Sequence, residues 1–176
     1  KFTLNMSKTM CEDRADILMN EHTDIVVDDQ TAQKYLDDLF DREDFWTQAN
    51  QLIEFVSWSG TGAFVVRQET DPVRGAQTHI DYVSALSIYP LAWKNNQITA
   101  CAFVSAYVDQ VAGTLLYVAV HAPNAEGVYV VNNSCFDSDG KRVALPAGVM
   151  ESWVSGSVYP TFQIITLGVL VRLMGS

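Results

Sequence analysis

Histidine and cysteine are the side chains in this sequence best suited to bind a metal. The imidazoles are His22, His79 and His121. None has a second His, Cys or acidic residue at a helical or strand spacing that would bring both groups to one metal. The three cysteines, Cys11, Cys101 and Cys135, are widely spaced and include no C-x-x-C pair. The sequence therefore predicts reduced, packed thiols, no metal site and no cofactor.

Three short motifs resemble catalytic or ligand-binding loops but lack essential parts of them. Gly60-x-Gly62 follows a helical pattern and precedes a strand pattern, whereas a dinucleotide loop needs the opposite order. Asp137-x-Asp139-Gly140 would place Cys135 and Pro146 at ligand positions of a calcium loop, so it predicts a turn. The serines near Gly60 lie at a helix C-terminus, which disfavours an oxyanion. We predict that the chain has no catalytic residue.

Two alternatives stay open from the residues alone. One is a small soluble enzyme of an unrecognised class, whose best candidate residues are His79 and His121. The other is a monomeric module that binds another protein through a single apolar patch. The enzyme would need a polar cleft, and the module would not self-associate.

The charge balance excludes a general affinity for DNA. Eleven Lys and Arg stand against 21 Asp and Glu, which gives a net charge of −10. Such a surface repels a phosphate backbone, although nucleic acid can pass an acidic wall without binding to it. The apolar stretch 162–174 is interrupted by Gln163, Gly168 and Arg172. It is too short to cross a bilayer, so we predict no membrane partner.

The hydrophobic pattern changes from helical to β near Gly60. It predicts a helix over about 5–20, a second helix capped by Asp28-Asp29, and a third from about Asp44 to the glycines at 60 and 62. Five β-rich runs follow: 63–68, 78–83, 97–107, 114–121 and 128–133. The fold class is therefore α+β, with about three N-terminal helices packed on a mainly antiparallel sheet. We expect a helical layer at 1–62, a β-rich part at 63–166 and a C-terminal tail at 167–176.

Aromatic residues are unusually dense around the third helix. Phe40, Phe45, Trp46, Phe55 and Trp58 fall close together. This is more aromatic surface than one amphipathic helix easily buries in a small monomer. We predict that Phe45, Trp46, Phe55 and Trp58 form a subunit interface. The alternative is that the helical layer covers the sheet and buries all five.

Several segments, taken in order, resemble the portal proteins of tailed bacteriophages that infect Gram-positive hosts. They are Met6-Ser7-Lys8, Cys11-Glu12-Asp13 with Ala15-Asp16 and Leu18, Asn20-Glu21, Val27-Asp28-Asp29, Asn50-Gln51-Leu52-Ile53-Glu54, Gly60-Thr61-Gly62-Ala63-Phe64, Ile80-Asp81-Tyr82-Val83-Ser84-Ala85, Ile88-Tyr89-Pro90-Leu91, Trp93 and Phe162-Gln163-Ile164-Ile165-Thr166. The resemblance covers nearly the whole chain.

The resemblance implies a structural subunit of a homo-oligomeric ring, usually a dodecamer, at one capsid vertex. Such a ring supports head assembly and provides a channel through which DNA is packaged and ejected without sequence specificity. Its other partners are the scaffold and capsid proteins, the head–tail adaptor and terminase. Terminase supplies the ATPase. The implied location is the virion, and the host cytoplasm during assembly. The family has no catalytic residues to carry over, and this chain resembles its outer, wing-like α+β region.

The C-terminal end departs from the family pattern. In portal proteins, the segment that resembles 162–166 leads into an Asn-rich passage and then into the long helices that line the channel. Here the apolar run 167–174 follows instead. We therefore expect 167–176 to be a divergent tail and the channel-lining helices to be absent, through either a natural or an engineered truncation.

Overall fold

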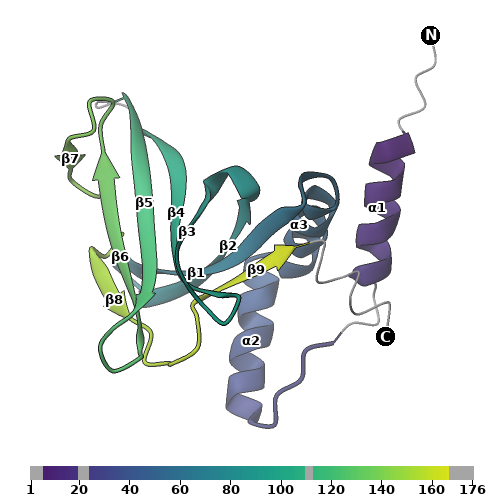
Figure 1. Ribbon diagram of the computed structural model, residues 1–176. Helices are drawn as coiled ribbons and strands as arrows, with labels where there is room; N and C mark the ends of the chain where they lie inside the picture. The colour runs from purple at the N-terminus through teal and green to yellow at the C-terminus, as the bar shows by residue number, and fades with distance from the viewer. Residues whose placement is uncertain (1–5, 20–23, 110–112, 167–176) are drawn as a thin grey trace. The chain divides into compact units, whose positions relative to one another are not determined.

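In the part of the chain that the structure describes, three helices precede nine strands. The computed structural model describes residues 6–19, 24–109 and 113–166 (Figure 1). The elements are α1 (Met6–Leu18), α2 (Gln30–Arg42), α3 (Phe45–Ser59), β1 (Thr61–Asp71), β2 (Gly75–Ser84), β3 (Ile88–Lys94), β4 (Gln97–Asp109), β5 (Gly113–Pro123), β6 (Tyr129–Phe136), β7 (Arg142–Val143), β8 (Ser152–Val154) and β9 (Phe162–Thr166), with a single 3-10 turn, Ala85–Ser87, between β2 and β3. The predicted α+β class is confirmed.

The chain forms two compact units. The first comprises 1–64, 80–85 and 164–176, and the second comprises 65–79 and 86–163. Strands β1, β2 and β9 form a three-stranded sheet in the order β2-β1-β9, and each of them runs from one unit into the other. The expected division into 1–62, 63–166 and 167–176 stays a prediction, and the tail lies outside the described residues.

Local capping fixes the ends of the second and third helices. The carboxylate of Asp29 accepts hydrogen bonds from the backbone N–H groups of Thr31 and Ala32 at 2.7 and 2.9 Å. This is the side-chain cap expected before α2. Helix α3 ends at Gly60, which adopts φ 88° and donates its N–H to the Val56 carbonyl at 2.8 Å. A left-handed residue closes a helix in this way, and glycine adopts that conformation at least cost.

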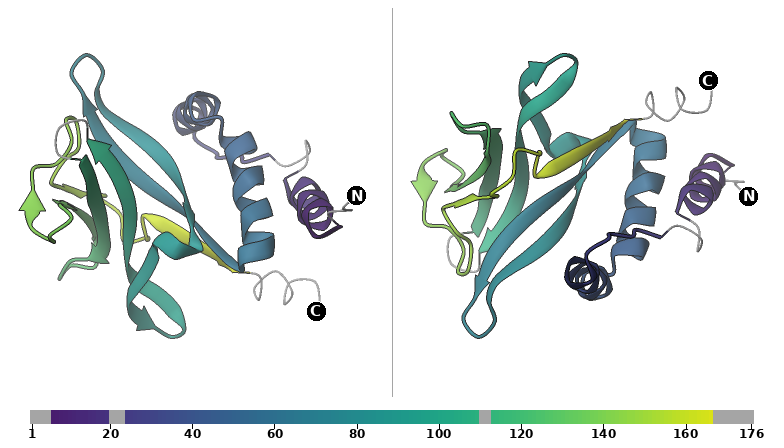
Figure 2. Two further views of the ribbon diagram at one scale, coloured as in Figure 1. Left: turned by 90° about the horizontal axis from the view of Figure 1, so that it is seen from above. Right: turned by 90° about the horizontal axis from the view of Figure 1, so that it is seen from below.

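The first unit is organised around one face of α3. Ala49, Leu52, Ile53 and Val56 are buried, at the spacing of a single helical stripe. Helix α1 lies beside α3 (Figure 2) and buries Ala15, while Asn50 on α3 donates a hydrogen bond to the Asp16 carboxylate at 2.9 Å. The helical layer is therefore held by both apolar packing and a polar bridge.

Strand β1 begins with a close approach to this stripe. A Cβ added at Gly62 would lie 2.7 Å from Val56 Cγ2, 2.9 Å from Leu52 Cδ1 and 3.3 Å from the Val83 carbonyl oxygen. The two carbon–carbon separations are well below the roughly 3.5–4.0 Å of carbon atoms in contact, and the separation from the carbonyl oxygen is also tight. Position 62 is therefore restricted to glycine by space.

The second unit contains a six-stranded antiparallel sheet in the order β3-β4-β5-β6-β7, with β8 also paired to β6. In its centre, Cys101 faces His121 and His121 faces Val131 across the strands. Burial alternates along β6 from Tyr129 to Cys135, as expected for a sheet with one covered face. The buried side of these strands forms the core of this unit.

His121 lies at the centre of that core and is only 1% exposed. Its Nδ1 shares a 2.7 Å hydrogen bond with the Thr161 hydroxyl, and its ring makes edge-to-face contacts with Phe103 and Phe162. Burial lowers the pKa of His121 from 6.5 to about 4. Burial also raises the pKa of the facing Cys101 thiol to about 11, so both groups are neutral near pH 7.

Most predicted elements match the structure closely. All three helices and the five predicted strands are present. All three cysteines are free thiols, of which Cys101 and Cys135 are buried and Cys11 is half-buried. The predicted turn at 71–75 is stabilised by the Asp71 carboxylate, which accepts from the N–H groups of Val73 and Arg74. The five predicted runs did not include β3, β9 or the short strands β7 and β8. Among the described residues, no helix is both long and apolar enough to cross a membrane.

We predict that Gly62→Ala lowers the free energy of unfolding by about 1–3 kcal/mol, because the new methyl group overpacks the α3 stripe. Urea denaturation measures this change. The added cost of Val56→Ala in the Gly62→Ala background should be smaller than its cost in the wild type, because it vacates the clashing volume. Gly60→Ala is the control, because nothing lies near a Cβ added at Gly60. In the Gly60→Ala background, the cost of Val56→Ala should be the same as in the wild type. Additive costs at Gly62 would contradict the steric explanation.

We also predict that stability falls as the pH decreases from about 6.5 to about 4. In this range the unfolded chain protonates His121, while the folded chain keeps it neutral. The shift in pKa corresponds to a loss of about 3 kcal/mol. His121→Gln should remove this part of the pH dependence in urea denaturation, and His79→Gln should retain it. An unchanged slope for His121→Gln would refute the prediction.

Candidate subunit interface

Helix α3 carries all four aromatic residues predicted to form an interface. Phe45 and Trp46 lie in its first turn, and Phe55 and Trp58 lie in its last turns. At a rise of about 1.5 Å per residue, the two pairs are separated by roughly 15 Å along the helix. The structure therefore divides the predicted interface into two separate aromatic pairs.

Phe45 and Trp46 belong to an aromatic cluster within the first unit. The Phe45 ring stacks on Phe40 with centroids 4.3 Å apart, and it lies 5.9 Å from the Phe64 ring. Trp46 makes edge contacts with Phe40 and Phe45. These contacts join the end of α2, the start of α3 and the start of β1. Phe45 and Trp46 are thus partly committed to holding this unit together.

Tyr82 on β2 completes the cluster. Its ring lies 5.6 Å from Phe64, edge to face. Its hydroxyl is buried without a hydrogen-bond partner among the described residues. Burial, reinforced by the nearby carboxylates of Glu43, Asp44 and Asp81, raises the pKa of Tyr82 to about 12. The phenol therefore stays neutral, and it cannot act as a base at physiological pH.

Phe55 and Trp58 form a second, more exposed group. Their ring centroids are 4.6 Å apart in an edge-to-face arrangement, and Trp58 is 66% exposed. Glu54 is half-buried on the adjacent turn and is the only charged residue in α3. A large aromatic surface open to solvent is the usual chemistry of a protein contact. The α3 patch, defined as Glu54, Phe55 and Trp58, has this character.

The imidazoles do not form a reaction centre among the described residues. His121 is enclosed in the core of the second unit, and His79 lies 3.9 Å from the Glu69 carboxylate. His22 lies outside the described residues. No group of three His, Cys, Asp or Glu side chains suited to a metal is found in 6–19, 24–109 and 113–166.

The loop at 137–140 is a turn, as predicted. The Asp137 carboxylate accepts hydrogen bonds from the N–H groups of Asp139 and Lys141 at 3.0 and 2.9 Å. The Asp137 carbonyl accepts a further bond from Gly140. One carboxylate oxygen is thus engaged by the backbone of its own loop, as in an Asx turn.

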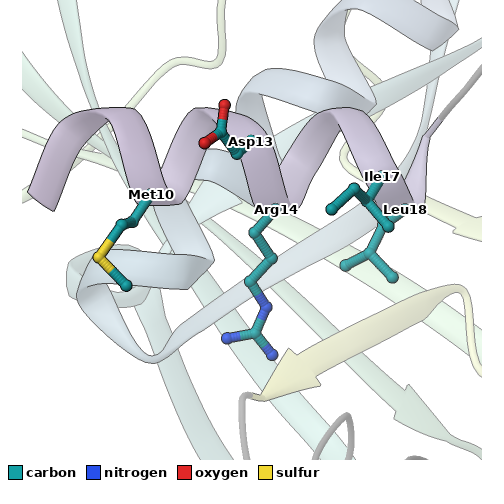
Figure 3. Close-up of a pocket in the computed structure, with 5 residues that line it drawn as sticks. All are labelled: Met10, Asp13, Arg14, Ile17 and Leu18. Atoms are coloured by element: carbon teal, nitrogen blue, oxygen red, sulfur yellow. The ribbon is translucent and has the colours of Figure 1, made fainter. Parts of the chain in front are cut away.

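A hollow on the first unit is lined by side chains of α1. The described lining residues are Met10, Asp13, Arg14, Ile17 and Leu18 (Figure 3). Met10 and Ile17 are largely exposed. The lining offers apolar contact and one charge of each sign. Its described residues include no Ser, Cys or His and no paired acid and base of the kind that catalysis needs.

Sequence reasoning missed a second exposed aromatic group, on β3. Tyr89, Leu91 and Trp93 are 51%, 53% and 61% exposed. The run Ile88-Tyr89-Pro90-Leu91-Ala92-Trp93 is apolar at both odd and even positions. Because a strand alternates its faces, such a run must expose apolar side chains unless both faces are covered. That signal could have located the group.

Comparison with known proteins identifies the family. The family described as "Phage portal protein, SPP1 Gp6-like" matches residues 1–140, which include all three helices, β1 to β6 and the α3 patch. A search of curated proteins found no match. With most of its length matched, and with helices followed by antiparallel sheets, this chain belongs to the SPP1 Gp6-like family of phage portal proteins.

Proposed function

We propose that this chain is the wing-like part of a portal subunit, which assembles with copies of itself into a ring and supports head assembly, DNA packaging and DNA ejection. The observation that carries the proposal is the family match over residues 1–140. Portal proteins are structural components of the capsid vertex. The finer roles in packaging and ejection are inferred for this chain from its family and its surface.

Charge supports a passive relation to DNA. The net charge of −10 opposes binding to phosphates. The acidity is concentrated in the first unit, whose sequence ranges contain 14 acidic and six basic residues, whereas the second unit contains seven and five. An acidic surface of this kind gives net repulsion toward packaged DNA, because no counterion-releasing contact forms.

The main partner in this proposal is a second copy of the same chain. A dodecamer is the ring size that the resemblance implies, and terminase, scaffold and capsid proteins, and the head–tail adaptor would contact the outside of the ring.

Of the four aromatic residues predicted at the interface, we assign Phe55 and Trp58 to the contact between subunits, because Trp58 is the more exposed of the two tryptophans. Phe45 and Trp46 would support that surface from within the unit.

The ring can be tested directly on the purified chain. Native mass spectrometry and electron microscopy of particles over a concentration series should give closed rings with one dominant subunit number. Recovery of the tagged chain in capsids, at a copy number fitting a single vertex, would test its place in the virion. A chain that stays monomeric at every concentration would contradict ring formation, and its absence from capsids would contradict the virion role.

Two single substitutions should separate folding from assembly. Phe45→Ala removes a ring stacked within the first unit and should lower the free energy of unfolding by about 2–3 kcal/mol. Trp58→Ala should change it by about 0.5 kcal/mol or less, because the side chain is mostly exposed. Urea denaturation measures both values, and sedimentation velocity measures association.

The effects of the two substitutions on association should rank in the opposite order to their effects on stability. Trp58→Ala should weaken association at a concentration where the protein is fully folded. Association as strong as in the wild type, together with unchanged stability, would exclude Trp58 from the interface.

A further inference from the structure

We propose that the β3 patch, defined as Tyr89, Leu91, Trp93 and Lys94, binds the α3 patch of a second copy of this chain in a head-to-tail contact. This inference rests on the proposed ring and names the two surfaces that close it. The β3 patch belongs to the second unit and the α3 patch to the first. Each chain therefore carries one copy of both surfaces.

The β3 patch has the chemistry of an interface centre. Its three large side chains are each more than half exposed. Lys94 is the only charged residue between Leu86 and Val108, in a chain where charges are otherwise frequent. Interface centres are depleted of charge and enriched in Tyr and Trp. The patch is therefore suited to a protein partner.

The backbone of β3 argues against the addition of a strand. Among the described strands, β3 pairs with β4 alone, so it lies at an edge of its sheet. Pro90 supplies no N–H, and the register shifts between Pro90 and Ala92 and again between Ala92 and Trp93. Proline, bulges and lysine are devices that protect an edge from strand pairing. The contact must therefore be made by the exposed side chains.

The α3 patch resembles the β3 patch in its aromatic character and carries the opposite charge. Each presents a tryptophan that is more than 60% exposed. Glu54 is the only charge of α3, and Lys94 is the only charge of the β3 region, so the two patches carry opposite signs. Within the chain, Lys8 forms an ion pair with Glu12 at 3.2 Å, and the nearby Glu54 carboxylate also helps to raise the pKa of Lys8. In the proposed contact, Lys94 of the second copy would be a further cation beside Glu54. A pair of this kind contributes to orientation more than to affinity.

Long-range charge favours a contact between unlike units. By residue count the first unit is strongly acidic, whereas the second has only two more acidic than basic residues. Two first units would repel each other about four times as strongly as a first and a second unit at the same separation, by Coulomb's law. A contact between two different surfaces is heterologous, and repeating it generates a closed ring when the rotation permits.

Mixing two deficient variants tests this arrangement. Trp58→Asp disables the α3 patch and Trp93→Asp disables the β3 patch. Each variant alone should be monomeric, with association weakened about 30-fold or more. An equimolar mixture should give a one-to-one dimer and nothing larger, because only one productive pair of surfaces remains. Native mass spectrometry with one isotopically labelled variant reads out the composition.

Charge reversal provides an independent measurement. Lys94→Glu should weaken association of the chain up to about fivefold, and combining it with Glu54→Lys should recover most of that loss. Val26→Asp and Val158→Asp are matched controls for the two Trp→Asp variants. They also replace an exposed apolar residue with Asp, but they lie outside the two patches. The controls should associate like the wild type. Circular dichroism and urea denaturation must show that every variant is folded.

The outcomes distinguish this inference from the proposed ring. If rings form in the wild type and persist in either Trp→Asp variant, the inference is wrong and the ring uses other surfaces. A mixture of the two variants that stays monomeric also overturns it, because the two patches then do not face each other. A wild type that never associates overturns both the ring and the inference.

Discussion

The approach of β1 to α3 at Gly62 is the constraint on which the first unit depends. An α-helix can bury only one stripe against a strand that lies this close, and α3 uses Leu52 and Val56 for that contact. Because the stripe is fixed, the remaining faces of α3 are fixed as well. The aromatic residues off the stripe must then pack against another element or face solvent. Both outcomes occur on the same helix.

The two ends of α3 differ because their surroundings differ. At the N-terminal end, α2 and the strands supply Phe40, Phe64 and Tyr82, which surround Phe45. At the C-terminal end the chain turns at Gly60 directly into β1, and the Phe55 ring lies edge to face against Trp58. The dense aromatic residues of the sequence therefore include both packed and solvent-exposed side chains. Only the neighbours in the folded structure show which is which.

Features with local causes were predictable from the sequence. The Asp29 cap, the Gly60 terminus, the turn at Asp71 and the buried stripe of α3 each depend on residues a few positions apart. Strand β3 was missed because its apolar residues do not alternate with polar ones and because Pro90 argues against a strand interior. It exists because β4 lies next to it, with Lys94-Asn95-Asn96-Gln97 as the turn, and pairing of that kind is not local.

The aromatic excess on α3 was visible in the sequence, but the surroundings of each ring were not. No helical periodicity distinguishes Phe45, which stacks within the unit, from Trp58, which faces solvent, and a subunit interface at these residues stays a prediction. The same limit applies to His121, whose enclosure depends on Thr161 and Phe162, some forty residues away in sequence.

Acidity and exposed aromatic surface place opposing demands on a self-associating chain. Strong like charge on the first unit suppresses indiscriminate contact between copies, but it is screened over about 8–10 Å at physiological salt. Apolar anchors act at contact distance and are hardly screened. Association is then possible where aromatic surfaces meet with little opposing charge, and it is suppressed elsewhere. A chain with a few such places can join copies in one orientation and still remain dispersed before assembly, which is the balance that an ordered ring requires.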